Sequence, residues 1–340
     1  MKKLLFSSLF IFALLLAAVL LWFYLFSTTP YISEQTPVRI VIATGNSLRQ
    51  VSAELKARDV ITSPRMFEVL ARIKGNARSI KSGTYEFNET LTPLDVLDRI
   101  QRGLVRLQPF TVPEGQTIFE TARIIAATGL ADEKELLVKT VDPDFIRHLE
   151  LSGNSLEGFL FPDTYFFSQA ASAESILKKM VERYRQVFAE EVQLAKKLLE
   201  LSEKDVVTLA SLVEAETGKS EERPLIAGVF LRRLKKGMRL ECDPTVVYGL
   251  LLLDPSFNKR LRRKHLLKNT PYNTYRNYGL PPGPICSPGR LAIRAVLQPA
   301  ETDFLFFVSR NNGSHQFSRT LREHNRAVKT YQKTRNTRKR

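Results

Sequence analysis

An uncharged apolar run at residues 4–26 constrains this 340-residue chain more than any other feature. At about 1.5 Å of rise per residue, a helix of this length spans roughly 35 Å, enough to cross a bilayer core. Because Lys2 and Lys3 precede the run and no base follows in the next four residues, the positive-inside rule predicts a cytoplasmic N-terminus. Residues 1–30 are therefore predicted to be an uncleaved single-pass anchor in the inner (plasma) membrane, with the rest of the chain outside. A cleaved signal peptide is disfavoured, because its apolar core is shorter and FSTTP offers no small-residue cleavage site.

The net charge of +16 would ordinarily suggest a nucleic-acid partner. Most of it is concentrated, because residues 259–268 carry +6 and residues 321–340 carry +7. The predicted anchor places both segments outside the cytoplasm, so we predict no nucleic acid among the partners. A nucleic-acid binder would need these segments in the cytoplasm, and protease accessibility of the C-terminus from the outer side would exclude it.

The two cysteines, Cys242 and Cys286, form no C-x-x-C pair, and their spacing leaves open whether they form a disulfide. The four histidines are scattered along the chain. Zinc sites need clustered Cys and His ligands, so we predict no metal and no cofactor.

Residues 37–130 are predicted to form an α+β region. A strand, a glycine turn and a capped helix occur twice, first at residues 38–58 and then at residues 110–127. Ser47 with Gln50, and Thr117 with Glu120, have the spacing of capping boxes. The segment between the copies has the patterns of a helix, a strand and a second helix, at 64–74, 83–87 and 93–102.

Residues 131–332 are predicted to form a second, mixed region, followed by a basic tail at 333–340. Residues 131–190 are mostly helical in pattern, with an aromatic interruption at 152–167. Further on we expect helices at 205–217, 221–236, 290–297 and 318–332, loops at 243–249, 270–275 and 280–289, and a strand at 304–309. The region lacks the βαβ rhythm and glycine fingerprint of a nucleotide-binding fold.

The helix ending in VEAETG is the best candidate for chemistry. Val206, Leu209, Ala210 and Val213 share one helical face, and Glu216 lies at the edge of that face. A carboxyl at this position is partly desolvated, which raises its pKa as a general acid requires. Glu214 projects to the other side, because residues two apart do not face each other. The alternative is an ordinary glutamate in the last helical turn, with its carboxylate in solvent.

A second candidate set consists of loop residues rich in aromatic, amide and carboxylate groups. Such groups suit sugars, whose flat apolar faces alternate with hydroxyls. The set comprises Glu157, Asp163, Asp243, Tyr248, Tyr272, Asn273 and Tyr275. The alternative is turn chemistry around Pro162, Pro244 and Pro271, which needs no ligand. His324, on the final helix, is either a proton shuttle or a helix-surface residue.

Several strings together resemble the YceG-like endolytic murein transglycosylases. They are KSGTYEF (81–87), LEGFLFPDTY (156–165), LASLVEAET (209–217), GMRLECDPTVVYGL (237–250), TPYNTY (270–275), GLPPGPICSPG (279–289) and HNRAV (324–328). The resemblance covers about residues 2–332. It implies a single-pass anchor, a LysM-like α+β module at 37–130 and a YceG-like catalytic domain at 131–332.

The resemblance also implies cleavage of the MurNAc–GlcNAc β-1,4 bond in nascent glycan strands, giving 1,6-anhydro-MurNAc ends and terminating strand elongation. The family's catalytic residue corresponds to Glu216. The residues expected to contact substrate are Glu157, Asp243, Tyr248, Asn273, Thr274 and Tyr275. Glu157 and Asp243 are the candidates if a second carboxylate assists. Expected partners are peptidoglycan strands, the inner membrane and peptidoglycan synthases (penicillin-binding proteins). Two alternatives remain, a non-catalytic peptidoglycan-binding membrane protein and a glycoside hydrolase that leaves reducing ends.

Overall fold

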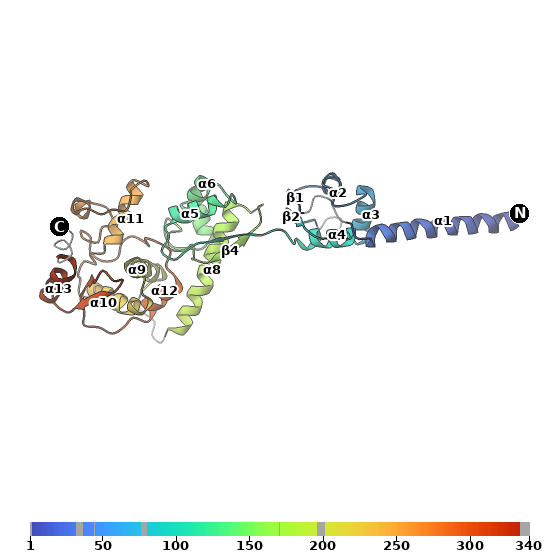
Figure 1. The fold of residues 1–340 in the computed structure, drawn as a ribbon. Helices are drawn as coiled ribbons and strands as arrows, with labels where there is room; N and C mark the ends of the chain where they lie inside the picture. The colour runs from blue at the N-terminus through green and yellow to red at the C-terminus, as the bar shows by residue number, and fades with distance from the viewer. Residues whose placement is uncertain are drawn as a thin grey trace. The chain divides into compact units, whose positions relative to one another are not determined.

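The computed structural model describes residues 2–31, 37–43, 45–75, 80–169, 171–195 and 201–333 (Figure 1). Residues 32–36, between the predicted anchor and the predicted α+β region, and nearly all of the predicted basic tail at 333–340 lie outside these ranges. Within them, the chain divides into two compact units. Unit 1 comprises residues 1–108 and 166–171, and unit 2 comprises residues 109–165 and 172–340.

Unit 1 begins with the long apolar helix α1 (Lys2–Thr28), drawn in blue in Figure 1. By length and composition, α1 can cross a membrane, consistent with the predicted single-pass anchor. Its C-terminal turns pack on α3 (Pro64–Ile73) and α4 (Pro93–Arg102). Phe23 and Phe26 contact the hydrophobic core of the unit, so the end of the apolar helix is part of a folded body.

The rest of unit 1 follows the order β1 (Val38–Ile42), α2 (Leu48–Ala57), α3, β2 (Gly83–Phe87) and α4. β1 and β2 form an antiparallel pair in which Val38 lies opposite Phe87. Alternate residues of both strands are buried, because one face of the pair covers the core and the other is more exposed. The predicted Ser47 capping box is present at the start of α2.

Unit 2 is built mainly of helices. The N-terminal half contains α5 (Ile118–Ala127), α6 (Glu133–Thr140), α7 (Pro143–His148), α8 (Ala173–Leu194) and the unit 2 residues of β3 (Gln108–Thr111) and β4 (Thr164–Phe167). β3 pairs with β4, and the predicted Thr117 capping box begins α5. Residues 109–130, which we expected to belong with the first module, thus pack within unit 2.

The core of unit 2 lies where α9 (Glu203–Glu216), α10 (Arg223–Lys235) and α12 (Arg290–Leu297) pack on one another. α8 also packs on α12, and the fully buried Glu191 of α8 holds the contact by accepting hydrogen bonds from Arg290 and Arg294. α10 is preceded by the short 3-10 helix η1 (Ser220–Glu222).

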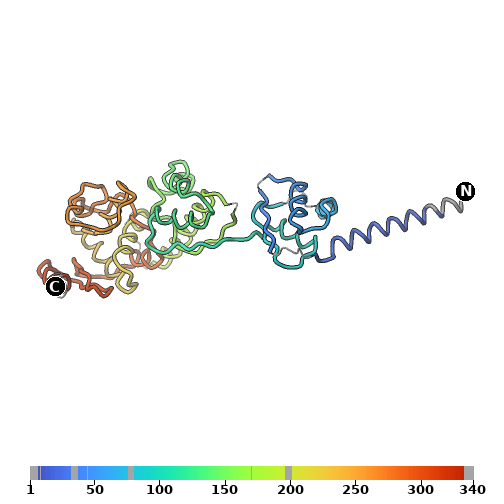
Figure 2. Tube along the Cα trace, turned by 45° about the horizontal axis from the view of Figure 1, so that its top comes forward, coloured from blue at the N-terminus to red at the C-terminus, as the bar shows by residue number. Residues whose placement is uncertain are grey.

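The remaining elements of unit 2 are α11, the loops that follow it, and a C-terminal hairpin with its helix. α11 (Asp243–Leu253) is followed by residues 254–289, which contain only the 3-10 helix η2 (Arg263–Leu267) and loops, drawn in orange in Figure 2. The hairpin of β5 (Phe306–Ser309) and β6 (His315–Ser318) follows α12, and α13 (Leu321–Val328), continued by η3 (Lys329–Lys333), packs on the hairpin.

Two local predictions are wrong. Residues 243–249 are not a loop but the first turns of α11, because Pro244 lies in the first helical turn, where the missing backbone N–H costs nothing. The expected helix at 318–332 begins only at Leu321, since residues 315–318 pair with β5 as a strand.

Candidate active site

Glu216 is the last residue of α9, and its side chain lines a cavity of about 530 Å³ in unit 2, here called the Glu216 cleft. The middle of α9, from Val206 to Val213, is buried on every side, which fixes the helix in the core. Its C-terminal turn therefore reaches the cleft from a rigid support. The other cleft residues used below are Arg233, Asp243, Tyr275, Phe306, His315, His324 and Asn325.

The surroundings of Glu216 favour its protonated form. Burial raises the pKa of the Glu216 carboxyl, and the nearby charge of Asp243 acts in the same direction. A hydrogen bond from the Cys242 thiol, together with His315 and Arg233, opposes this shift without reversing it. The C-terminal end of the α9 dipole also disfavours a negative charge at this position. A carboxyl that holds its proton in a cleft is what general acid catalysis requires.

Glu214 lies outside the cleft and makes structural contacts. One of its carboxylate oxygens is 2.5 Å from Nη2 of Arg223, and both side chains are only 6% exposed. The other oxygen accepts a hydrogen bond of 2.9 Å from the backbone N–H of Gly289. The two glutamates of α9 are thus directed to different surroundings, as their spacing predicts.

Asp243 and Tyr275 lie in the Glu216 cleft, where sequence reasoning expected substrate contacts. The Tyr275 hydroxyl donates a hydrogen bond of 2.7 Å to Asp243, the first residue of α11. This bond fixes the Asp243 carboxylate, which lines the cleft together with Glu216 and Glu241. An aromatic ring next to two carboxyl groups suits a sugar ligand.

Asn273 and Thr274 do not line the cleft, because both are buried and use their polar atoms within the protein. The Asn273 amide donates to the carbonyl oxygens of Leu266 and Lys268, and its oxygen accepts from the Tyr275 N–H. The Thr274 hydroxyl accepts from the backbone N–H of Cys242. These residues shape the loops that carry the cleft residues.

Glu157 and Tyr248 form a separate buried pair that the structure does not bring to the cleft. Glu157 is 2% exposed and accepts hydrogen bonds from the Ile118 N–H at the start of α5 and from Tyr248. Burial raises the pKa of Glu157 to about 8. Tyr248 also packs edge-on against Tyr272, with ring centroids 4.9 Å apart. Glu157 is therefore placed to cap a helix, and Asp243 is the carboxylate nearer Glu216.

Three further cleft residues escaped the sequence reasoning in whole or in part. His324 of α13, which sequence reasoning left open, stacks on Phe306 at 5.3 Å and lines the cleft; burial lowers its pKa, favouring a neutral ring. Its Nδ1 atom is buried and has no hydrogen-bond partner among the described residues.

His315 is oriented by Glu222, 2.7 Å from its Nδ1. Arg233 donates to the carbonyls of Leu240 and Leu305. No local pattern marks His315 or Arg233, because long-range folding brings them to the site.

The sequence left the pairing of the cysteines open, and the structure shows both as free and buried. Cys242 lies against Glu216, whereas Cys286 donates to the carbonyl oxygen of Ser211 in α9. Burial raises the pKa of both thiols, so both favour the protonated form.

A partly desolvated acid in a cleft with aromatic rings and a second carboxylate is the type of site that acts on glycans. Residues 40–330 match the model of the YceG-like family, and the chain belongs to this family. Among relatives, an endolytic murein transglycosylase of Bacillus subtilis is 33% identical over 89% of this chain and 87% of its own length. One from Streptococcus pneumoniae is 28% identical over 86% of this chain, which spans 58% of that protein. A crystal structure of a yceG-like protein from Listeria monocytogenes, 30% identical, superposes with a TM-score of 0.57 over 85% of this chain and 98% of its own.

Proposed function

We propose that this protein is an endolytic murein transglycosylase in which Glu216 is the single acid and base. The observation that carries the proposal is the raised pKa of a carboxyl that lines a cleft and ends a buried helix. Membership of the YceG-like family and the names of the relatives support it.

The reaction we propose breaks the β-1,4 bond between MurNAc and GlcNAc. Protonated Glu216 donates its proton to the bridging oxygen as the bond to C1 of MurNAc breaks and positive charge develops at C1. The C6 hydroxyl of the same MurNAc then attacks C1 and forms the 1,6-anhydro ring. Its proton passes to the Glu216 carboxylate, which restores the acid without water or a metal.

Asp243 is the proposed electrostatic partner in this step. Its carboxylate is fixed by Tyr275 and raises the pKa of Glu216, so it helps to keep the proton on the acid before the reaction. A negative charge at this place also stabilises the positive charge that develops on the sugar ring.

Glu216→Gln tests the assignment. The matched control is Glu221→Gln, an exposed glutamate of η1 that does not line the Glu216 cleft. Full-length protein in detergent is incubated with peptidoglycan and the products are analysed by mass spectrometry. Anhydro ends from the wild type and the control, and none from Glu216→Gln, are expected. Anhydro ends from Glu216→Gln refute the assignment, reducing ends indicate a hydrolase, and binding without cleavage by the wild type indicates a wall-binding protein.

The proposal also places the molecule in the cell. We propose that α1 anchors it in the inner membrane with its N-terminus in the cytoplasm, because the murein that the relatives' names mention lies outside that membrane. Reporter fusions at the C-terminus, active only on the outer side, test this orientation.

Peptidoglycan synthases, which extend nascent strands at the same surface, are the proposed partners, and cleavage there terminates strand elongation. Crosslinking and co-purification from membranes test the contact.

Unit 1 is proposed to be the LysM-like, glycan-holding module. Its β1–α2–α3–β2 order, with the two strands paired antiparallel, supports this assignment. Pull-down of unit 1 variants with insoluble peptidoglycan tests whether it contributes to binding.

A further inference from the structure

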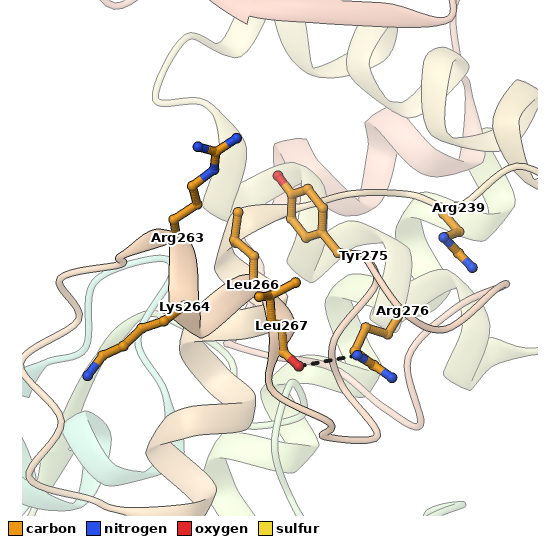
Figure 3. Close-up of a pocket in the computed structure, with 7 residues that line it drawn as sticks. All are labelled: Arg239, Arg263, Lys264, Leu266, Leu267, Tyr275 and Arg276. Atoms are coloured by element: carbon orange, nitrogen blue, oxygen red, sulfur yellow. Dashed lines mark hydrogen bonds between the residues drawn. The ribbon is translucent and has the colours of Figure 1, made fainter.

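Unit 2 contains a second cavity, of about 770 Å³, whose lining is strongly basic (Figure 3). The cationic side chains that line it are Arg239, Arg263, Lys264 and Arg276, and we call this cavity the basic pocket. Arg263 and Lys264 come from η2, Arg239 from the segment after α10, and Arg276 from the loop after Tyr275. Residues far apart in the sequence thus line one cavity with four basic side chains, whose charged ends point in different directions around it (Figure 3).

No carboxylate neutralises these charges within the part of the chain that the structure describes. None of the four cations forms an ion pair with a described acidic residue, and all four are exposed. Arg239 lies over the ring of Tyr278, 4.5 Å from its centroid. Arg276 donates to the carbonyl oxygen of Leu267 at 3.3 Å, the bond drawn in Figure 3. Four cations around one cavity, with no described counter-charge, give it a positive potential that favours a bound anion.

The basic pocket adjoins the Glu216 cleft through Tyr275, which lines both cavities. The Tyr275 hydroxyl is bonded to Asp243 in the cleft. A long ligand that packs against Tyr275 beside Glu216 therefore brings its neighbouring groups to the basic pocket. An anion bound in the basic pocket can then belong to the same molecule that lies in the Glu216 cleft.

We propose that the basic pocket binds the carboxylates of a peptide stem on the glycan strand that lies in the Glu216 cleft. This inference rests on the proposed function. The sugar hydroxyl and acetamido groups of such a strand are uncharged, and its ionised carboxylates are carried by the peptides attached to the muramyl residues. Guanidinium groups match carboxylates in both charge and geometry, and three of the four cations are arginines.

The test compares glycan strands that carry stems with strands stripped of stems by an amidase, in which the lactyl carboxylate that the amidase leaves on each muramyl residue is capped as an amide. The variant is Arg239→Gln with Lys264→Gln in the full-length protein in detergent. The control, Lys134→Gln with Lys178→Gln, removes the same charge from two exposed residues of unit 2 that line neither cavity. For the pocket variant we expect KM to rise about fivefold on stem-bearing strands, with kcat unchanged, and no change on stripped strands. For the wild type, salt raises KM on stem-bearing strands only.

Two results overturn the proposal. One is an unchanged KM for the pocket variant on stem-bearing strands. The other is an equal rise of KM on both substrates. That result would mean that the cations stabilise the fold or bind another anion, such as a terminal phosphate.

A binding measurement separates this proposal from the proposed function. A soluble disaccharide-peptide fragment is titrated by calorimetry into the Glu216→Gln protein, with the basic pocket intact or carrying the replacements Arg239→Gln and Lys264→Gln. Weaker binding after replacement supports the pocket even if the wild type cleaves neither substrate, in which case only the proposed reaction fails. Equal binding, or displacement of the fragment by inorganic phosphate at the same concentration, refutes the pocket while leaving the reaction intact.

Discussion

Glu214 and Glu216 lie two residues apart on α9, and replacing each by glutamine is predicted to have opposite consequences. Glu214→Gln destabilises the protein but does not change the activity of the molecules that are folded. Glu216→Gln removes the activity and leaves the stability nearly unchanged. The comparison isolates position, since the chemical change is identical in both variants.

The magnitude for Glu214 follows from its partners. Removing one member of a buried ion pair costs about 3–5 kcal/mol, because the other charge stays buried. Arg223 is 6% exposed, but it keeps a second contact of 3.3 Å to Glu114, whose side chain is 44% exposed. This remaining partner places the expected loss near the lower limit, about 3 kcal/mol. For a unit of this size such a loss lowers Tm by about 9 °C.

Glu216 has no ion-pair partner of this kind among the described residues, and burial already disfavours its charge. A neutral amide is therefore tolerated, and we expect a change in stability within about 1 kcal/mol. Thermal unfolding of the full-length proteins, followed by circular dichroism, measures both effects, and anhydro-end release well below Tm measures activity. The reasoning is refuted if Glu214→Gln melts with the wild type, or if folded Glu214→Gln is as inactive as Glu216→Gln.

Three further predictions concern the other polar groups near the site. Burial raises the pKa of Glu157 from 4.5 to about 8, so the folded state keeps a proton that the unfolded chain releases in this window. Stability then falls as pH rises from 4.5 to 8, by at most about 1.4 kcal/mol per pH unit, and Glu157→Gln flattens this slope in melts across pH. Cys242→Ala removes a hydrogen bond that favours ionised Glu216; the pKa of Glu216 rises, and the alkaline limb of the kcat–pH profile moves to higher pH, whereas an unchanged profile contradicts the contact. Tyr275→Phe releases Asp243 and is expected to lower kcat/KM about tenfold without changing Tm; wild-type kinetics would exclude a role for this bond.

Much of the fold was predictable where local chemistry decides the structure. The capping boxes at Ser47 and Thr117 lie within single turns, so four residues contain all the information needed. β1 is recognisable because alternate residues face the core. α11 was missed because Asp243 followed by Pro244 is a signal for a turn and equally for the first turn of a helix, and only packing distinguishes them.

The site was predictable in part for a similar reason. Helical periodicity predicts that Glu214 and Glu216 point to different surroundings, but it does not predict that α9 is buried on every side from Val206 to Val213. Asn273 has the hydrogen-bonding groups of a ligand-binding residue, yet its side-chain amide donates both hydrogen bonds to backbone carbonyl oxygens nearby in its own loop. Glu157 meets the Ile118 N–H only because the chain returns 39 residues later, a contact that no local pattern encodes.

The packing of Phe23 and Phe26 into the core of unit 1 bears on how the molecule responds to its membrane. If α1 spans the bilayer, no slack separates the span from the first folded body, and the two move as one piece. A thinner bilayer then tilts α1 further and turns unit 1 with it, since a helix longer than the hydrocarbon core adapts by tilting. The thickness of the bilayer therefore affects the orientation of unit 1. The height of unit 1 above the membrane is set by the geometry of α1 rather than by the variable extension of a flexible linker.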